Sequence, residues 1–168
     1  MKRLAATLLL LVVAGAAGAQ QAILLVRHAE KATDANEAGV PLSEAGAARA
    51  ARLAEVLKSA GVTAVYATDT VRARKTAEPV AKAAGLQVRI YTPKDADGKP
   101  APGILVDRLK KEEPKGIVLV VGHSNTLPEI LAALGYAAKV EIPSSQYDDL
   151  FVVTPKAEGP PSVVHLKY

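Results

Sequence analysis

From residue 22 onward, short apolar runs alternate with segments of helical periodicity, and this alternation limits the possible folds more than any other feature. Strands are predicted at residues 22–27, 62–67, 86–91, 116–121, 149–154 and 162–167, and helices at 43–61, 70–84, 104–113 and 126–134. The first and fourth runs are apolar at nearly every position, as is typical of strands buried on both faces. The pattern predicts an α/β fold, a three-layer sandwich with a mainly parallel central sheet.

Residue types at the ends of these segments support the boundaries. Ser43 is a good N-cap for the first helix. Gly61 ends this helix, and Gly85 and Gly135 follow the second and last helices as stop signals. Pro79 interrupts the second helix and could kink or split it. Residues 92–103, rich in Pro, Asp, Gly and Lys, predict a loop.

The first 19 residues have the pattern of a secretory signal peptide. A basic start at Lys2 and Arg3 precedes an apolar stretch, and Ala17-Gly18-Ala19 fits a small-x-small cleavage site. The apolar stretch is shorter than the ~20 residues of a membrane span. We therefore expect a signal peptide at residues 1–19, a domain at residues 20–168, a periplasmic or secreted location, and no stable membrane insertion after cleavage; an uncleaved N-terminal anchor is the alternative.

Composition narrows the class of protein. Cleavage would leave roughly 150 residues, the size of one ordinary domain, and would lower the formal charge of +4 by the two charges of Lys2 and Arg3. No basic tail or interleaved aromatic residues accompany the positive charge, which argues against a nucleic-acid partner. The absence of cysteine excludes thiol chemistry and cysteine-based metal sites.

Two of the three histidines stand at the ends of the most apolar predicted strands. His28 follows Arg27, the last residue of the run 22–27, and His123 follows the run 116–121 and Gly122. Ligands of open α/β sheets bind beyond the carboxyl ends of the strands. The sequence therefore predicts that the two imidazoles share one pocket.

Arg72 supplies a second arginine for this pocket. It lies in the first turn of the helix after the second strand, whereas Arg74 is ~200° around the helix axis and should face elsewhere. Guanidinium groups bind two phosphate oxygens at once, and a neutral imidazole can attack phosphorus. The combination favours covalent chemistry on a phosphate.

Four motifs in order resemble the histidine phosphatase superfamily, which includes phosphoglycerate mutases and small phosphohistidine phosphatases. They are Arg-His-Ala-Glu at 27–30, Leu-Ser-Glu-Ala-Gly at 42–46, the Tyr-to-Ala segment 66–77, and Val-Val-Gly-His at 120–123. The resemblance implies a phosphoglycerate mutase-like fold, His28 as the nucleophile, and Arg27, Arg72 and His123 as the rest of the catalytic pocket. It also implies hydrolysis of a phosphomonoester without a metal or another cofactor.

The chain departs from the family pattern at three positions. Ala29 replaces the usual Gly, Ala67 replaces a usual Ser, and Lys31 stands where Thr or Ala is common. Lys31 could add positive charge to the rim of the pocket or be solvated, and Asn125 could touch substrate or, with its neighbours, cap the last helix.

The group that protonates the leaving oxygen is not evident. The family's larger members carry a catalytic Glu in an insertion that this chain lacks, so Asp95 and Asp97 in the loop 92–103 are the candidates for a general acid. A solvated acidic turn is the alternative for both. Glu30 could be an acid, but we expect it to hold an arginine or a helix N–H, and we expect His165 to be an exposed residue on an edge strand.

Two other functions remain open. Two histidines and an aspartate could bind zinc, but the chain has no close His pair, and Arg27 would repel a cation. A periplasmic protein that binds a phosphorylated ligand without turning it over could keep the same pocket. We expect an exported phosphatase acting on a small-molecule or envelope phosphoester, such as a phosphosugar, by analogy; the oligomeric state stays open.

Overall fold

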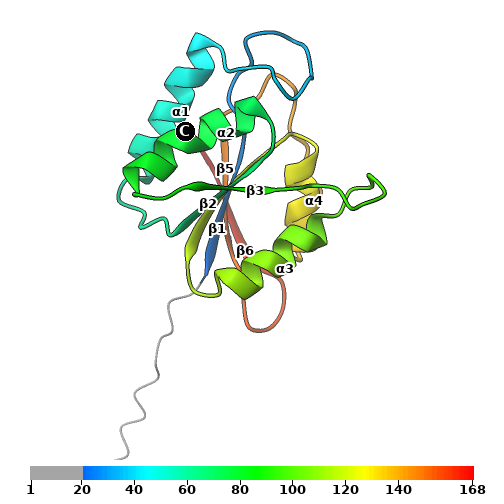
Figure 1. Ribbon diagram of the computed structural model, residues 1–168. Coiled ribbons are helices and arrows are strands. Elements are labelled where there is room, and N and C mark those ends of the chain that lie inside the picture. Colours follow the sequence, from blue (N-terminus) through cyan, green and yellow to red (C-terminus); the bar gives the residue numbers. More distant parts are fainter. Residues whose placement is uncertain (1–20) are drawn as a thin grey trace, which may run out of the picture.

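In residues 21–168, six strands form one central sheet (Figure 1). The computed structural model describes residues 21–168, so the predicted signal peptide lies outside the described residues. The strands are β1 (Ala22–Arg27), β2 (Ala64–Thr68), β3 (Val88–Tyr91), β4 (Ile117–Gly122), β5 (Asp149–Thr154) and β6 (Ser162–Lys167), in the order β3-β2-β4-β1-β5-β6. Strands β1 to β4 run parallel, and β5 runs antiparallel to both of its neighbours, β1 and β6, which confirms a mainly parallel sheet.

Helices cover both faces of the sheet and complete the predicted three layers. Helices α1 (Glu44–Leu57) and α2 (Val71–Ala83) lie on one face, and α3 (Pro102–Glu112) and α4 (Thr126–Ala133) lie on the other (Figure 1). Alternate residues of β1 enter the two separate cores: Ile23 packs with α3 and α4, and Leu24 packs with α1 and α2. Burial on both faces explains why the runs of β1 and β4 are continuously apolar.

Local signals set the starts of α1 and α2 as predicted, whereas α1 ends at Leu57, ahead of the predicted stop at Gly61. Ser43 Oγ accepts a hydrogen bond from the Gly46 N–H at 3.0 Å, and Thr70 caps α2 in the same way. Pro79 lies within α2 without ending it. Helix α3 begins at Pro102, two residues earlier than predicted, because proline is well tolerated in the first turn of a helix.

Strand boundaries and the acidic loop differ slightly from the prediction. Strands β2 and β3 each begin two residues later than expected, at Ala64 and Val88. The loop after β3 folds back on itself through a bridge between Lys94 and Pro100. The segment is therefore an ordered turn that stands beside the carboxyl edge of the sheet.

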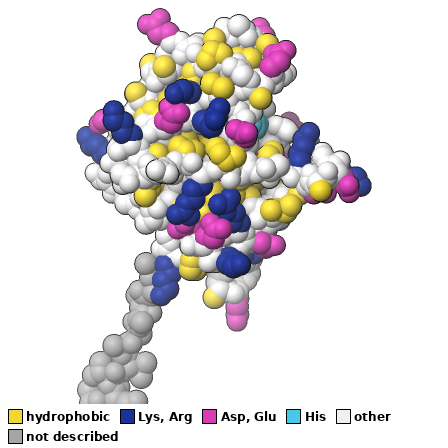
Figure 2. All heavy atoms as spheres, in the orientation of Figure 1, with side chains coloured by type: hydrophobic (Ala, Val, Ile, Leu, Met, Phe, Trp, Pro, Cys, Tyr) yellow, Lys and Arg dark blue, Asp and Glu magenta, His cyan; other side chains and the backbone are white. Residues whose placement is uncertain are grey.

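Positive and negative side chains are interspersed over the face of the molecule seen in Figure 2. On the described surface, Arg89 pairs with Glu113, and Arg108 pairs with Glu112 at 3.0 Å. Exposed pairs of this kind contribute little to stability, with a typical value of about 0.5 kcal/mol. Within residues 21–168, no helix has the length and apolarity needed to cross a membrane.

Candidate active site

The two strand-end histidines lie side by side. In the parallel pairing of β1 with β4, Arg27 is opposite Gly122, so His28 and His123 leave the sheet at the same level. Their ring centroids are 5.1 Å apart and the rings are inclined by 63°. The structure thus brings together the pair that the sequence predicted.

A cavity of about 680 Å³ opens beside these rings. Six predicted residues line it: Arg27, His28, Lys31, Arg72, His123 and Asn125. The others are Asn36, Thr70, Pro93, Lys94, Pro100, Ser124, Thr126 and Glu129. A larger groove of about 1150 Å³ lies elsewhere, against α1, α2 and β3, and none of the three histidines lines it. The smaller cavity is therefore the candidate active site.

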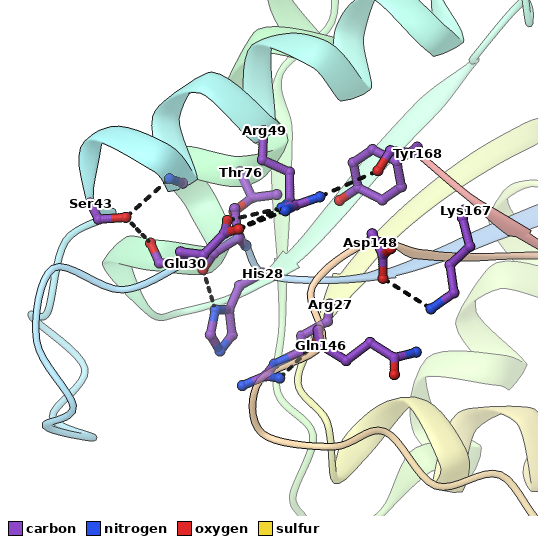
Figure 3. A network of polar contacts seen from close by, with 12 residues as sticks. Arg27, His28, Glu30, Ser43, Arg49, Thr76, Gln146, Asp148, Lys167 and Tyr168 are labelled. Carbon is purple, nitrogen blue, oxygen red and sulfur yellow. Dashed lines mark hydrogen bonds and ion pairs between the residues drawn. The ribbon is translucent and has the colours of Figure 1, made fainter.

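Hydrogen bonds fix the orientation of the His28 ring. Its Nδ1 lies 2.8 Å from the Ala29 carbonyl oxygen, so Nδ1 carries the proton and donates it (Figure 3). The Ala29 N–H in turn donates to Thr76 Oγ1 at 2.9 Å, and that hydroxyl donates to the Arg72 carbonyl. The chain of bonds leaves the lone pair on His28 Nε2 as the free nucleophilic position.

Burial keeps both rings neutral. It lowers the pKa of His28 to about 3, and the positive charges of Arg27 and Arg72 add to the effect along with the neighbouring His123. Burial likewise lowers the pKa of His123 to about 4, again helped by both arginines. A neutral imidazole is the form that can attack phosphorus.

These pKa values predict an unusual acid limb in the pH profile. Because burial lowers the pKa of His28, its ring takes up a proton only at low pH, and a reaction that needs the neutral imidazole should be lost only there. For p-nitrophenyl phosphate, whose leaving group needs no proton, we expect kcat/KM, corrected for ionisation of the substrate, to stay constant from neutral pH down to about pH 5. A midpoint near 6.5, the ordinary histidine value, would contradict this expectation; circular dichroism at each pH checks that the protein stays folded.

His123 is held by two threonines. Its Nε2 lies 2.8 Å from Thr68 Oγ1, at the end of β2, and its backbone N–H donates to Thr126 Oγ1 at 2.9 Å. Three neighbouring parallel strands therefore contribute to one site. Thr68 is 2% exposed, so its contact with His123 is shielded from water.

Arg27 is held by backbone carbonyl groups. Its Nη1 donates to the carbonyl oxygens of Pro143, Ser144 and Gln146 at 2.9–3.0 Å, and Figure 3 shows the bond to Gln146. The ring of Tyr147 lies 4.0 Å from the guanidinium carbon. The loop between α4 and β5 thus fixes Arg27 without neutralising it.

Arg72 is held in a similar way, by the Glu37 carbonyl oxygen at 3.0 Å. Arg74 faces the other groove, as the helical geometry predicted, and pairs with Asp69 at 3.7 Å. Arg27 and Arg72 are 5% and 7% exposed, and each has a buried Nε without a partner. No described carboxylate lies within 4 Å of either guanidinium group. Buried cations without counter-ions are costly, which favours an anion in this cavity.

Lys31 is less available than the sequence suggested. Its ammonium group donates to the carbonyl oxygens of Asp34 and Ala35 and to Asn36 Oδ1, at 2.8–3.0 Å. All three of its N–H bonds are used by the loop 34–36. Lys31 lines the cavity and contributes charge, but its donors organise that loop.

Asn125 also lines the cavity. The alternative prediction, that its side chain caps α4, is not met. It stands at the N-cap position, where its side chain forms no capping bond. The local bonds instead come from Thr126, whose hydroxyl bonds both the N–H and the carbonyl of His123. The Asn125 side chain remains free to contact a ligand.

The structure does not bring Asp95 or Asp97 into the cavity. Asp95 Oδ1 accepts the backbone N–H groups of Asp97 and Lys99 at 3.0 and 2.9 Å, which stabilises the turn. The loop reaches the cavity with Pro93, Lys94 and Pro100 instead. This placement favours the acidic-turn alternative for both residues.

Glu30 binds Arg49, which agrees with the prediction that it holds an arginine. Its carboxylate accepts bonds from Arg49 Nε at 2.8 and 2.9 Å (Figure 3). His165 lies on the edge strand β6, as expected, and also bonds the buried carboxylate of Asp149. Neither Glu30 nor His165 lines the cavity.

Several residues of the site could not be singled out from the sequence. Thr76 was part of a motif but was not singled out, and Tyr147, Glu129 and the carbonyls of 143–146 carried no signal in the sequence that pointed to the site.

No group of three or more His, Asp or Glu residues in the described part of the chain could hold a metal ion.

Comparison with known proteins agrees with the motifs. Residues 23–92 match the family model of the histidine phosphatase superfamily (branch 1), a stretch that includes Arg27, His28 and Arg72; His123 lies beyond it. No match was found among curated protein sequences.

Solved structures share the fold. The protein histidine phosphatase SixA complexed with tungstate is 20% identical, with a TM-score of 0.70, covering 87% of this chain and 96% of that chain. A protein described as an alpha-ribazole-5'-P phosphatase from Escherichia coli K-12 is 18% identical, with a TM-score of 0.70 and coverage of 89% and 97%. SixA from Agrobacterium tumefaciens, described as a phosphohistidine phosphatase, is 19% identical, with a TM-score of 0.66 and coverage of 88% and 97%.

The family match and the fold confirm the resemblance to the histidine phosphatase superfamily. The fold is that of phosphoglycerate mutase-like histidine phosphatases.

Proposed function

We propose that this protein hydrolyses phosphomonoesters through a phosphohistidine intermediate on His28. The observation that carries the proposal is a neutral His28 with a free Nε2, beside two buried guanidinium groups that have no carboxylate partner within residues 21–168. Such a cavity favours a phosphoryl group, which carries the missing negative charge and offers oxygens to both arginines.

The reaction proceeds in two displacements. Arg27 and Arg72 bind the phosphoryl oxygens, and His28 Nε2 attacks phosphorus as the ester oxygen leaves. With the Thr68 hydroxyl bonded to its Nε2, His123 presents Nδ1–H to a transferring oxygen. Water then attacks the phosphorus, breaks the P–N bond and releases inorganic phosphate. The arginines supply the positive charge that a metal would otherwise provide, so we propose that the reaction is metal-independent.

Turnover and trapping test this function together. The purified domain is mixed with p-nitrophenyl phosphate in the presence of a chelator, and quenched samples are analysed for phosphate on His28. We expect chelator-resistant turnover and a phosphorylated His28 peptide. A requirement for zinc would contradict the proposal. Binding of phosphoesters without turnover would favour the non-catalytic binding protein.

Arg72→Lys tests the need for a planar, two-pronged donor. Lysine keeps the charge but loses the geometry that binds two oxygens at once, and we expect kcat/KM for p-nitrophenyl phosphate to fall by about 10². Arg74→Lys is the matched control on the same helix, since Arg74 faces the other groove. Equal, small effects of the two changes would show that Arg72 does not bind the transferred group.

Export is proposed from the sequence of residues 1–19 alone. A periplasmic enzyme would meet phosphoesters of the envelope, such as phosphosugars, and the proposed substrate is a small-molecule or envelope phosphoester. Expression of the full chain, followed by cell fractionation and N-terminal sequencing, tests this localisation. We expect a periplasmic product that begins at Gln20; an intact N-terminus in the membrane fraction would indicate the anchor.

A further inference from the structure

We propose that Glu129 is the catalytic acid that protonates the leaving oxygen. The inference rests on the proposed phosphatase function and supplies a group that the sequence did not identify. Among the described aspartate and glutamate residues, Glu129 is the one that lines the cavity with His28 and His123. It lies on α4 and not in the loop 92–103, where the sequence had placed the candidates for this role.

The fold aims Glu129 at the cavity. Helix α4 begins at Thr126, three residues after His123, and Glu129 lies in its first turn. Leu127 and Ile130 on either side of this position are buried in the core, which fixes the rotation of the helix. The Glu129 side chain is therefore held on the face of α4 that borders the cavity.

Glu129 has no other evident task. Its carboxylate is half-buried and has no hydrogen bond or ion pair within residues 21–168. By contrast, Glu30 is bonded by Arg49, and Asp149 by Gln146, His165 and Lys167. A partly buried carboxylate without a partner contributes nothing to the fold that would explain its position.

Phosphate binding does not explain Glu129 either. A carboxylate repels the phosphate dianion that Arg27 and Arg72 attract, so it weakens binding of the ground state. Its presence is explained if it acts on the ester oxygen, where a proton is needed as the bond breaks. Lys31 is a poor alternative because its three N–H bonds are already used by the loop 34–36.

The proton balance closes over the two steps. As His28 Nε2 bonds to phosphorus, the P–O ester bond breaks, its electron pair stays on oxygen, and that oxygen takes the proton from the Glu129 carboxyl to form the alcohol. In the second step the Glu129 carboxylate takes a proton from the attacking water as the P–N bond breaks. Inorganic phosphate leaves, and His28 and the protonated Glu129 are restored.

The Glu129→Gln variant distinguishes between two roles of Glu129, as a proton donor or as a residue that only shapes the site. Nitrophenolate is a stable anion and leaves without a proton, whereas an alkoxide does not. We expect the variant to lose about 10²-fold in kcat/KM for glycerol 2-phosphate and less than about threefold for p-nitrophenyl phosphate. The measurement uses kcat/KM because this ratio ends at release of the alcohol and excludes hydrolysis of the phosphoenzyme, which the two substrates share.

Glu44→Gln is the matched control. Glu44 lies in the first turn of α1, so the change removes a carboxylate from an equivalent helix position away from the cavity. We expect both substrates to react with Glu44→Gln as with the wild type. Equal losses on both substrates in Glu129→Gln, or no loss on either, would overturn the assignment. Failure of the wild type to turn over p-nitrophenyl phosphate would instead overturn the proposed function.

Discussion

Replacement of His28 by alanine is expected to lower kcat/KM for p-nitrophenyl phosphate by about 10³-fold or more. Among the described residues that line the cavity, His28 is the only one with an imidazole ring that is fixed in orientation and has a free nitrogen, and the change removes it. His123 cannot take its place, because its Nε2 is bonded to Thr68. Loss of a nucleophile also abolishes the covalent intermediate, so no phosphorylated peptide should be trapped.

His165→Asn serves as the control for this experiment. His165 lies on β6, outside the cavity, and its replacement should leave turnover within about threefold of the wild type. Persistence of turnover in His28→Ala, with the fold intact by circular dichroism, would mean that another residue or bound water attacks phosphorus. The trapped phosphate, if present, would identify that residue.

Gly46→Ala should produce the largest loss of stability among single-methyl changes in this site. A Cβ at position 46 would overlap the carbonyl oxygen of Glu30, a backbone atom that cannot move independently. That same carbonyl accepts the Ser43 N–H at 2.9 Å, so the start of α1 packs directly on the segment that follows His28. Overpacking of this kind costs roughly 1–3 kcal/mol, more than the ~1 kcal/mol that alanine gains over glycine in a helix.

Urea unfolding of Gly46→Ala and Gly103→Ala measures this effect. Gly103 lies in α3, is exposed, and has no atom within 4 Å of the position that an alanine methyl group would take, so alanine there should be neutral or stabilising. We also expect Gly46→Ala to reduce turnover, because relief of the overlap shifts the backbone beside His28. Equal unfolding free energies for Gly46→Ala and the wild type would contradict the close packing of α1 on Glu30.

Much of the fold followed from local signals in the sequence. The apolar runs of β1 and β4 predicted buried strands, and Ser43 marked the start of α1. The strand order was not predicted, because pairing between strands depends on contacts far apart in the chain. In the site, Arg72 could be chosen over Arg74 because helical geometry separates their directions.

The parts that were missed share a physical reason. The carbonyl oxygens that hold Arg27 exist at every position of a chain, so residue types cannot reveal them. Glu129 becomes a candidate only when the rotation of α4 is known. Lys31 resembled a free cation in the sequence, whereas the loop it binds is visible only in three dimensions.

The position of Arg27 depends on the backbone of the loop between α4 and β5 more than on the types of the residues it bonds. Peptide carbonyls at Pro143, Ser144 and Gln146 bind the guanidinium group, and they are present whatever side chains those positions carry. The side chains at these three positions can therefore be exchanged, as long as the backbone path is kept, without removing these hydrogen bonds to Arg27. The loop is a place where an engineer, or natural variation, can change what surrounds the reacting group while the reaction centre stays intact.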